Sequence, residues 1–403
     1  MPPSDSPNNS SSAKALTFAA YASFVPIGIA TVLLGPMLPT LSERWSLNYS
    51  QAGALINVQY VASTVAVALS GMLAARLGFR FAIKTGLLLM SAGVGLLVVG
   101  PKWLGMCCVG AYGGGLGLAV PAGNLMVAEV NPGRRSATLN LLNFCWSAGA
   151  VVCPFLVAAA ARSHQVALLL AVVAGFALLM AIGIAAMPAS IVEPSSNKDA
   201  GRNTRLTIPW RNGGLLVLAA LFFLYVGVEN GFGFWLATYS KNLGKMSPTM
   251  AIMTSSFFYA ALMLGRWVAP LLLRLTDEIR LVQAGLLVAC TGMAGLVLSH
   301  GLRGVVASAC LAGMGLAYVY PITISLLSRQ FGAEASRLGS ILFTLSNIGG
   351  GLLPWMVGAA SNHFGSLKAG LAVPLIGCAG MFALYLREWR TAKVEEIHSL
   401  PAV

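Results

Sequence analysis

Two charged side chains stand out because each lies well inside a long apolar segment. Glu229 lies within the apolar run 213–238, and Arg266 lies within the run 249–273. An ionised group is costly to bury away from water, so such a residue is a candidate for function by default. A carboxylate in this setting can accept hydrogen bonds from solute hydroxyls, bind a cation or take up a proton. The alternative is a structural carboxylate that holds helices together.

The two charges lie at different heights if both segments are regular helices. At ~1.5 Å of rise per residue, we expect Arg266 roughly 10 Å nearer one membrane surface than Glu229. A direct ion pair would then need a helix break or a long side-chain reach. We expect Glu229 to bind solute and couple an ion. We expect Arg266 to act in gating, and hydrogen bonding to carbonyls at a helix end is the structural alternative.

Polar side chains also recur at helical spacing on two other apolar segments. Asn143 lies on a polar face of the segment 137–161, and Asn347 lies on a similar face of the segment 336–360. Such faces can form hydrogen bonds between helices or can line a solute pathway, and both interpretations stay open. On the second interpretation, both amides bind solute.

The composition indicates whether these segments lie in water or in lipid. Of 403 residues, 57% are hydrophobic and only 9% are charged. A soluble domain carries roughly 25% charged residues, so a soluble class is excluded. The net charge of +13 comes from Lys and Arg in short polar gaps, with no basic stripe between aromatics, so a nucleic-acid partner is excluded as well.

The apolar runs have the length of transmembrane helices, for which about 20 residues are needed. They are too long and too uniformly apolar for the strands of a closed barrel, so the sequence predicts an all-α integral membrane protein with twelve spans. The predicted spans are 17–40, 51–75, 81–100, 103–128, 137–161, 165–187, 213–238, 249–273, 281–299, 304–328, 336–360 and 368–386.

The distribution of basic residues predicts the orientation. Seventeen Lys and Arg fall on one side of the twelve spans, seven fall on the other, and Arg266 completes the 25. The positive-inside rule then places both termini in the cytoplasm, and we expect a multi-pass protein of the inner membrane. The predicted organisation is a disordered tail 1–16, a six-helix bundle 17–187, a linker 188–212, a second six-helix bundle 213–387 and a tail 388–403.

An internal repeat relates the two halves. At an offset of 200 residues, glycines and prolines coincide without a gap, as at Gly113/Gly313, Gly115/Gly315, Pro121/Pro321, Gly149/Gly349 and Pro154/Pro354. Parallel repeats of this kind suggest two pseudo-symmetric bundles around a solute site near the membrane midplane. The glycine runs lack a following Gly-Lys-Ser/Thr, and the seven cysteines lack metal or disulfide spacing. We therefore expect no cofactor, no metal and no enzymatic activity.

The loop after the second span carries a recognisable motif. It reads Gly71-Met-Leu-Ala-Ala75-Arg76-Leu-Gly78-Phe-Arg80. Together with the twelve spans and the repeat, it resembles the signature Gly-x-x-x-Asp-Arg-x-Gly-Arg-Arg of the major facilitator superfamily, over residues 17–390. In that family the Asp joins a charge relay that latches the cytoplasmic side. Ala75 stands in its place here, while the resemblance implies gating roles for Arg76 and Arg80.

The seventh span indicates a branch of that family. Its run Tyr225-Val-Gly227-Val-Glu229-Asn230, followed by Trp235 and Tyr239, is similar to the fucose permease and sodium-dependent glucose transporter branch, as is Gly265-Arg266. Val120 departs from that branch, which has an acid four residues before the position of Asn124. In the family the first, fourth, seventh and tenth spans line the cavity. The resemblance therefore implies solute contacts from Glu229, Asn230, Asn124, Tyr318 and Tyr320, with Trp146 and Trp235 as possible stacking faces.

These features together predict a monomeric secondary transporter that moves a small polar solute, foremost a sugar, by alternating access with proton or sodium symport. Glu129 and Arg134 are two more gating candidates, and a solvated surface ion pair is their alternative. An efflux transporter of amphipathic compounds working by proton antiport is the main rival. A membrane sensor or scaffold is the third possibility, although neither tail is long enough for an output domain.

Overall fold

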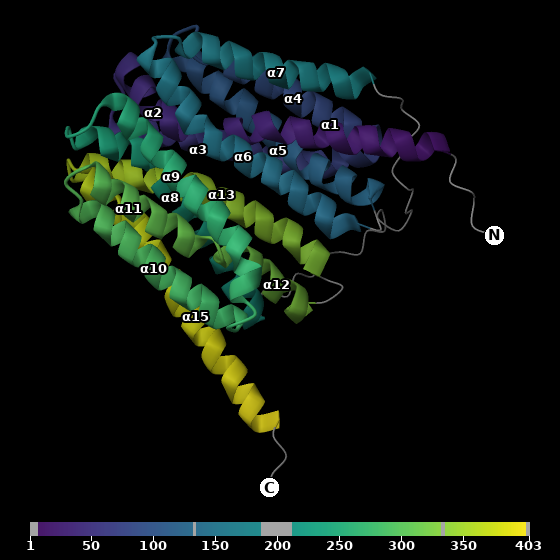
Figure 1. Cartoon of the computed structure of the whole chain (residues 1–403), viewed down its shortest axis with the longest axis vertical. Coiled ribbons are helices and arrows are strands. Elements are labelled where there is room, and N and C mark those ends of the chain that lie inside the picture. Colours follow the sequence, from purple (N-terminus) through teal and green to yellow (C-terminus); the bar gives the residue numbers. More distant parts are fainter. Residues whose placement is uncertain (1–6, 132–133, 187–211, 332–334, 400–403) are drawn as a thin grey trace. The chain divides into compact units, whose positions relative to one another are not determined.

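The computed structural model describes residues 7–131, 134–186, 212–331 and 335–399, and its regular elements in these ranges are α-helices (Figure 1). The predicted linker 188–212 and the far ends of both tails fall outside the described residues, apart from residue 212. The helices from the first half of the sequence are α1 Pro7–Val32, α2 Leu34–Arg44, α3 Tyr49–Leu77, α4 Phe79–Gly95, α5 Lys102–Val130, α6 Arg135–Arg162 and α7 Val166–Ala186. Those from the second half are α8 Gly213–Asn242, α9 Pro248–Leu272, α10 Glu278–Leu298, α11 Leu302–Leu316, α12 Val319–Phe331, α13 Ala335–His363, α14 Leu367–Gly370 and α15 Ala372–Ser399.

Eleven stretches of the described chain are long and apolar enough to cross a membrane. The remaining predicted span, 81–100, corresponds to α4, a helix of 17 residues with the same apolar character. Three spans contain a short interruption: the first divides into α1 and α2, the tenth into α11 and α12, and the twelfth into α14 and α15. The predicted fold class, an all-α membrane protein with twelve spans, is therefore confirmed.

Three helices of the second half, α8, α9 and α10, begin at a side chain that accepts hydrogen bonds from the first backbone N–H groups. At the start of α8, the side chain of Asn212 accepts hydrogen bonds from Gly214 N and Leu215 N. Ser247 caps α9 in the same way before Pro248, and Asp277 caps α10. Because such caps satisfy donors that lack a partner within the helix, they fix the register in which each apolar face enters its bundle.

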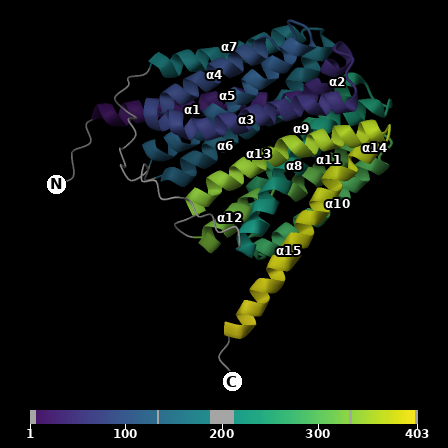
Figure 2. The same ribbon diagram turned by 180° about the vertical axis from the view of Figure 1, so that it is seen from behind.

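The chain divides into two compact units. The first unit comprises the described residues within Met1–Thr40 and Val58–Thr207, and the second comprises those within Leu41–Asn57 and Ile208–Val403. The first turns of α3 therefore belong with the second unit, which nothing in the sequence indicated. Within the first unit α4 packs between α5 and α7, and within the second α8 packs against α9, α12, α13 and α15 (Figure 2).

Equivalent glycines make the same kind of close contact in each unit. A Cβ atom built on Gly149 would lie 2.2 Å from the carbonyl oxygen of Val25, and one on Gly349 would lie 2.0 Å from that of Phe223. The 200-residue register therefore corresponds to a repeated packing arrangement, in which glycine lets two helix backbones approach closely.

Candidate functional site

The described part of the second unit contains a cluster of polar and aromatic side chains around α8. Phe222, Tyr225 and Glu229 are spaced by three and four residues, so they lie on one face of this helix. Glu229 is buried, with 11% of its side chain exposed. We call this set, together with Arg266, Tyr320 and Phe343, the Glu229 cluster.

Arg266 reaches this face from α9. Its Nη2 donates a hydrogen bond of 2.9 Å to the hydroxyl of Tyr225 and lies 3.7 Å from a carboxylate oxygen of Glu229. Both α8 and α9 are continuous here, so the reach of the arginine side chain closes the distance without a helix break. Gly265 helps to position it, because a Cβ there would lie 2.5 Å from the Cβ of Ala317, which keeps α9 close to the end of α11.

Aromatic rings complete the cluster. The ring of Tyr320 on α12 lies 5.4 Å from that of Tyr225 and 5.7 Å from that of Phe222, measured between centroids. Phe343 on α13 lies 5.6 Å from Phe222 and 6.4 Å from Tyr320. Four helices thus bring two phenol rings and two phenyl rings to one carboxylate and one guanidinium. The rings lie beside the charges, while the phenol hydroxyls supply neutral donors and acceptors.

The other predicted solute contacts of the second unit lie in different settings. Asn230 is 8% exposed, and Tyr318 lies between α11 and α12, where its ring lies against Gly285 of α10. Asn347 is half-buried on α13, one turn beyond Phe343. Of these three, Asn347 lies on a helix face that also presents a ring to the Glu229 cluster.

Trp235 is a packing residue rather than an open stacking face. Its side chain is fully buried, and its Nε1 donates a hydrogen bond of 2.9 Å to the carbonyl oxygen of Pro354. The indole of α8 thus joins α8 to α13 through a buried hydrogen bond. The sequence resemblance suggests a stacking role for Trp235 because the seventh span lines the cavity in the family.

The predicted contacts of the first unit bond mostly within that unit's own helices. The side-chain amide of Asn124 donates to Val120 O, and that of Asn143 donates to Leu139 O, both at 2.9 Å. Trp146 Nε1 donates to the hydroxyl of Thr31 on α1 at 3.2 Å. Each of these bonds lies within a single helix or between α1 and α6, and a solute role for these three residues stays a prediction.

The predicted gating residues of the first unit lie near helix ends. Arg80 Nη2 donates to Ile184 O and Ala185 O at the end of α7, where carbonyl groups lack N–H donors within the helix. Arg76, Glu129 and Arg134 are exposed. Arg80 thus joins α4 to α7, and a gating role for all four residues stays a prediction.

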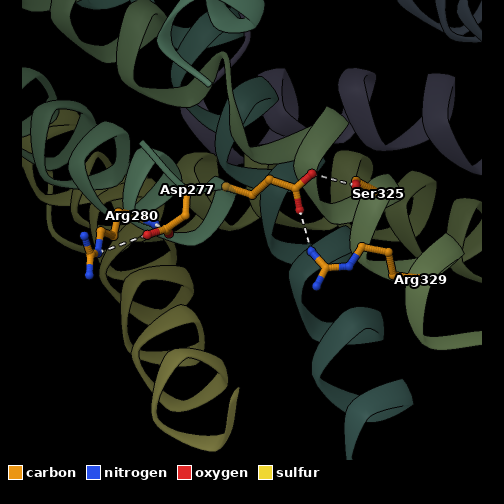
Figure 3. A network of polar contacts seen from close by, with 5 residues as sticks. Asp277, Arg280, Ser325 and Arg329 are labelled. Carbon is orange, nitrogen blue, oxygen red and sulfur yellow. Dashed lines mark hydrogen bonds and ion pairs between the residues drawn. The ribbon is translucent and has the colours of Figure 1, made fainter. Parts of the chain in front are cut away.

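One polar network was not found from the sequence. Glu278 at the start of α10 accepts a hydrogen bond of 2.8 Å from Ser325 Oγ and forms an ion pair of 3.0 Å with Arg329, both on α12 (Figure 3). Beside it, Asp277, which caps α10, pairs with Arg280 of that helix at 3.0 Å. The offset of 200 aligns Arg329 with Glu129, so the charge at this position is reversed between the halves. That reversal was a sequence signal that could have indicated the network.

A second set of contacts ties Leu41–Asn57 to the rest of the second unit. Lys241 forms an ion pair with Glu43, and Asn242 donates a hydrogen bond of 2.9 Å to the hydroxyl of Tyr49. Both partners come from the first half of the sequence, and spacing along the chain gives no indication of such contacts.

Comparisons with known proteins identify the family. A sequence model described as Major Facilitator Superfamily matches residues 20–354, and no curated protein sequence matches the chain. Several solved structures share the fold. The fucose:proton symporter FucP of E. coli is 19% identical, with 92% of this chain and 97% of that chain covered and a TM-score of 0.63. A D-xylose-proton symporter is 16% identical, with 92% and 96% covered and a TM-score of 0.74.

A bacterial homolog of the human lysosomal transporter Spinster, in an inward-facing and unoccupied conformation, is 15% identical, with 96% and 98% covered and a TM-score of 0.76. At these identities the likeness concerns the fold, and the family follows from the sequence match over most of the chain. The predicted superfamily is confirmed, and an enzyme is not indicated. This chain belongs to the major facilitator superfamily and is a multi-pass membrane transporter.

Proposed function

We propose that this transporter moves a small hydroxylated solute of the sugar class by alternating access, in symport with a cation bound at Glu229. The observation that carries the proposal is the pairing of a buried carboxylate with a guanidinium among phenol rings in the second unit. Aromatic faces beside a few polar groups suit a solute that has both C–H faces and hydroxyls. The proposal keeps a proton or a sodium ion as the coupling ion, a monomer as the working unit, and an inner-membrane location with cytoplasmic termini.

The comparisons support the sugar class only by analogy. Two of the fold relatives are named as a fucose:proton and a D-xylose-proton symporter. The run from Tyr225 to Tyr239 resembles the fucose permease branch, and the structure brings Tyr225 and Glu229 of this run to one helix face. Because Val120 replaces the acid which that branch has in its fourth span, coupling here depends on the second unit.

Counterflow and gradient-driven accumulation of labelled sugars in proteoliposomes test the proposal. We expect the wild type to do both, and Glu229→Gln to retain counterflow while losing accumulation, since a neutral amide cannot cycle with a cation. Exposed Lys245, in the loop between α8 and α9, provides the matched control Lys245→Gln. Expulsion of a hydrophobic dye with no sugar exchange would favour the efflux rival. Full accumulation by Glu229→Gln would remove Glu229 from the coupling.

A further inference from the structure

The guanidinium of Arg266 has more hydrogen-bonding capacity than its surroundings use. It carries five N–H donors in a planar fork. In the described part of the chain, Tyr225 is the one residue that accepts a hydrogen bond from it. The carboxylate of Glu229 lies 3.7 Å away, beyond ordinary hydrogen-bond distance. A guanidinium can bind a planar anion through two parallel N–H···O hydrogen bonds. None of the described residues forms such a pair of bonds with Arg266.

The Arg266 side chain is also partly exposed. Of the Arg266 side chain 29% is exposed, against 11% for Glu229. Charged side chains within a membrane face the bundle interior or water rather than lipid. A molecule that enters the Glu229 cluster can thus reach Arg266 without first displacing a bidentate carboxylate.

Among the described residues of the Glu229 cluster, the negative charge of Glu229 is balanced only by the positive charge of Arg266. Elsewhere in the described helices of the second unit, charged residues lie in the terminal turns of the candidate spans or outside them. The titratable groups facing Glu229 are Tyr225 on its own helix, Arg266 on α9 and Tyr320 on α12. The described residues of α11, α13 and α15, which also pack near α8, contribute no charged side chain to the cluster.

Protonation of Glu229 therefore changes which class of solute the Glu229 cluster can bind. A proton on Glu229 leaves Arg266 as an uncompensated positive charge among aromatic rings, which is unfavourable. A neutral sugar does not relieve this charge. A solute carboxylate does, because it can take the free N–H groups of Arg266, and it would be repelled if Glu229 stayed ionised. Proton and anion then each favour the binding of the other, and this coupling is reciprocal.

We propose that the solute of this transporter is a hydroxylated monocarboxylate, a sugar acid, bound by Arg266 when Glu229 takes up one proton. This inference rests on the proposed function and narrows its solute class. One proton and one monoanion enter together, so each transport cycle moves no net charge. The proton comes from the aqueous phase and leaves to the other side with the solute, and no covalent bond changes.

Binding to the full chain in lipid nanodiscs tests the inference. The acidic probes are D-glucuronate, D-galacturonate and D-gluconate, and the matched neutral compounds are D-glucuronamide, D-galactose and D-glucose. Titrations in sodium-free buffer at about pH 5.5 and about pH 7.5 leave all three acids ionised. We expect at least one acid to bind more tightly than its neutral counterpart. Its affinity should rise by up to about tenfold for each pH unit of acidification, as expected for one linked proton.

Variants separate the proposed proton binding at Glu229 from the proposed solute binding at Arg266. Glu229→Gln should bind the acid with an affinity that no longer depends on pH. Arg266→Lys keeps the charge without the fork and should weaken acid binding by roughly tenfold or more. Lys245→Gln should leave binding unchanged. Monodispersity and circular dichroism establish that each variant is folded, and the comparison of acid with amide in the wild type needs no variant at all.

Uptake into proteoliposomes gives a second readout. A pH gradient, acidic at the entry side, should drive accumulation of the acid, and a membrane potential alone should not. If neutral sugars exchange while the acids do not, or if acid binding is independent of pH, the sugar-acid inference is wrong and the broader transport proposal stands. If none of the six compounds exchanges, the proposed function fails as well.

Discussion

Arg266 donates its one hydrogen bond from the described chain to Tyr225, one helical turn before Glu229 on α8. The hydroxyl of Tyr225 accepts this hydrogen bond, and the guanidinium of Arg266 lies 3.7 Å from the carboxylate of Glu229. Tyr225 is therefore a positioning residue for the charge pair.

Tyr225→Phe should weaken solute binding, because Arg266 loses its acceptor and can close on Glu229 as a direct pair. We expect a loss of roughly tenfold in affinity, and a loss of up to about 1.5–3 kcal/mol in stability from the removal of a hydrogen bond to a charged group. Titration and thermal unfolding of the same preparation measure both. Unchanged affinity with reduced stability would leave Tyr225 with a structural role only.

Gly113→Ala should destabilise the first unit, whereas Gly114→Ala should not. A Cβ on Gly113 would lie 2.4 Å from the carbonyl oxygen of Gln59, and one on Gly114 has nothing within 4 Å. Overpacking of this kind costs about 1–3 kcal/mol, while alanine in an open helical position is favourable. Thermal unfolding of the two neighbouring variants compares them within one helix.

The repeat extends this prediction to the second unit. Gly313→Ala should behave like Gly113→Ala, because its Cβ would lie 2.3 Å from the carbonyl oxygen of Phe258. Wild-type stability in Gly313→Ala would mean that the register of 200 does not carry equivalent packing demands.

Trp235→Phe should lower stability without lowering solute affinity, because the indole joins α8 to Pro354 of α13 by a buried hydrogen bond. Loss of this donor removes a buried hydrogen bond between the two helices, at a cost of about 0.5–1.5 kcal/mol. A comparable loss of solute affinity in a variant that remains folded would restore the stacking role suggested by the sequence.

Neutralising Arg329 should have a small effect on stability, under about 1 kcal/mol, because exposed ion pairs contribute little. Its side chain is 70% exposed, and that of Glu278 is 28% exposed. We expect a larger effect on transport rate if the pair forms and breaks during the cycle. The exchange Glu278→Arg with Arg329→Glu should recover part of the rate lost in either single variant, whereas a merely structural surface pair would show no such recovery.

Much of the fold could be predicted from the sequence. Twelve apolar runs predict twelve spans because the length of a helix that crosses lipid is set by the bilayer. The glycine register predicts close helix contacts because a missing Cβ is itself a packing property. Glu229 and Arg266 could be identified as candidates because a charge in an apolar run is costly wherever it lies.

The tertiary structure decided which of these residues meet. The rise of the two helices predicts that Glu229 and Arg266 lie at different heights. The length of the arginine side chain nevertheless brings its guanidinium to 3.7 Å from the carboxylate, between α8 and α9. Tyr225 and Trp235 belong to the same run of sequence, yet one faces the charge pair and the other is buried against Pro354. The reach of a side chain and its partners on distant helices cannot be inferred from local spacing. The sequence therefore determined the membrane environment, the spans and the candidate charged residues, and helix packing determined which of these residues form the site.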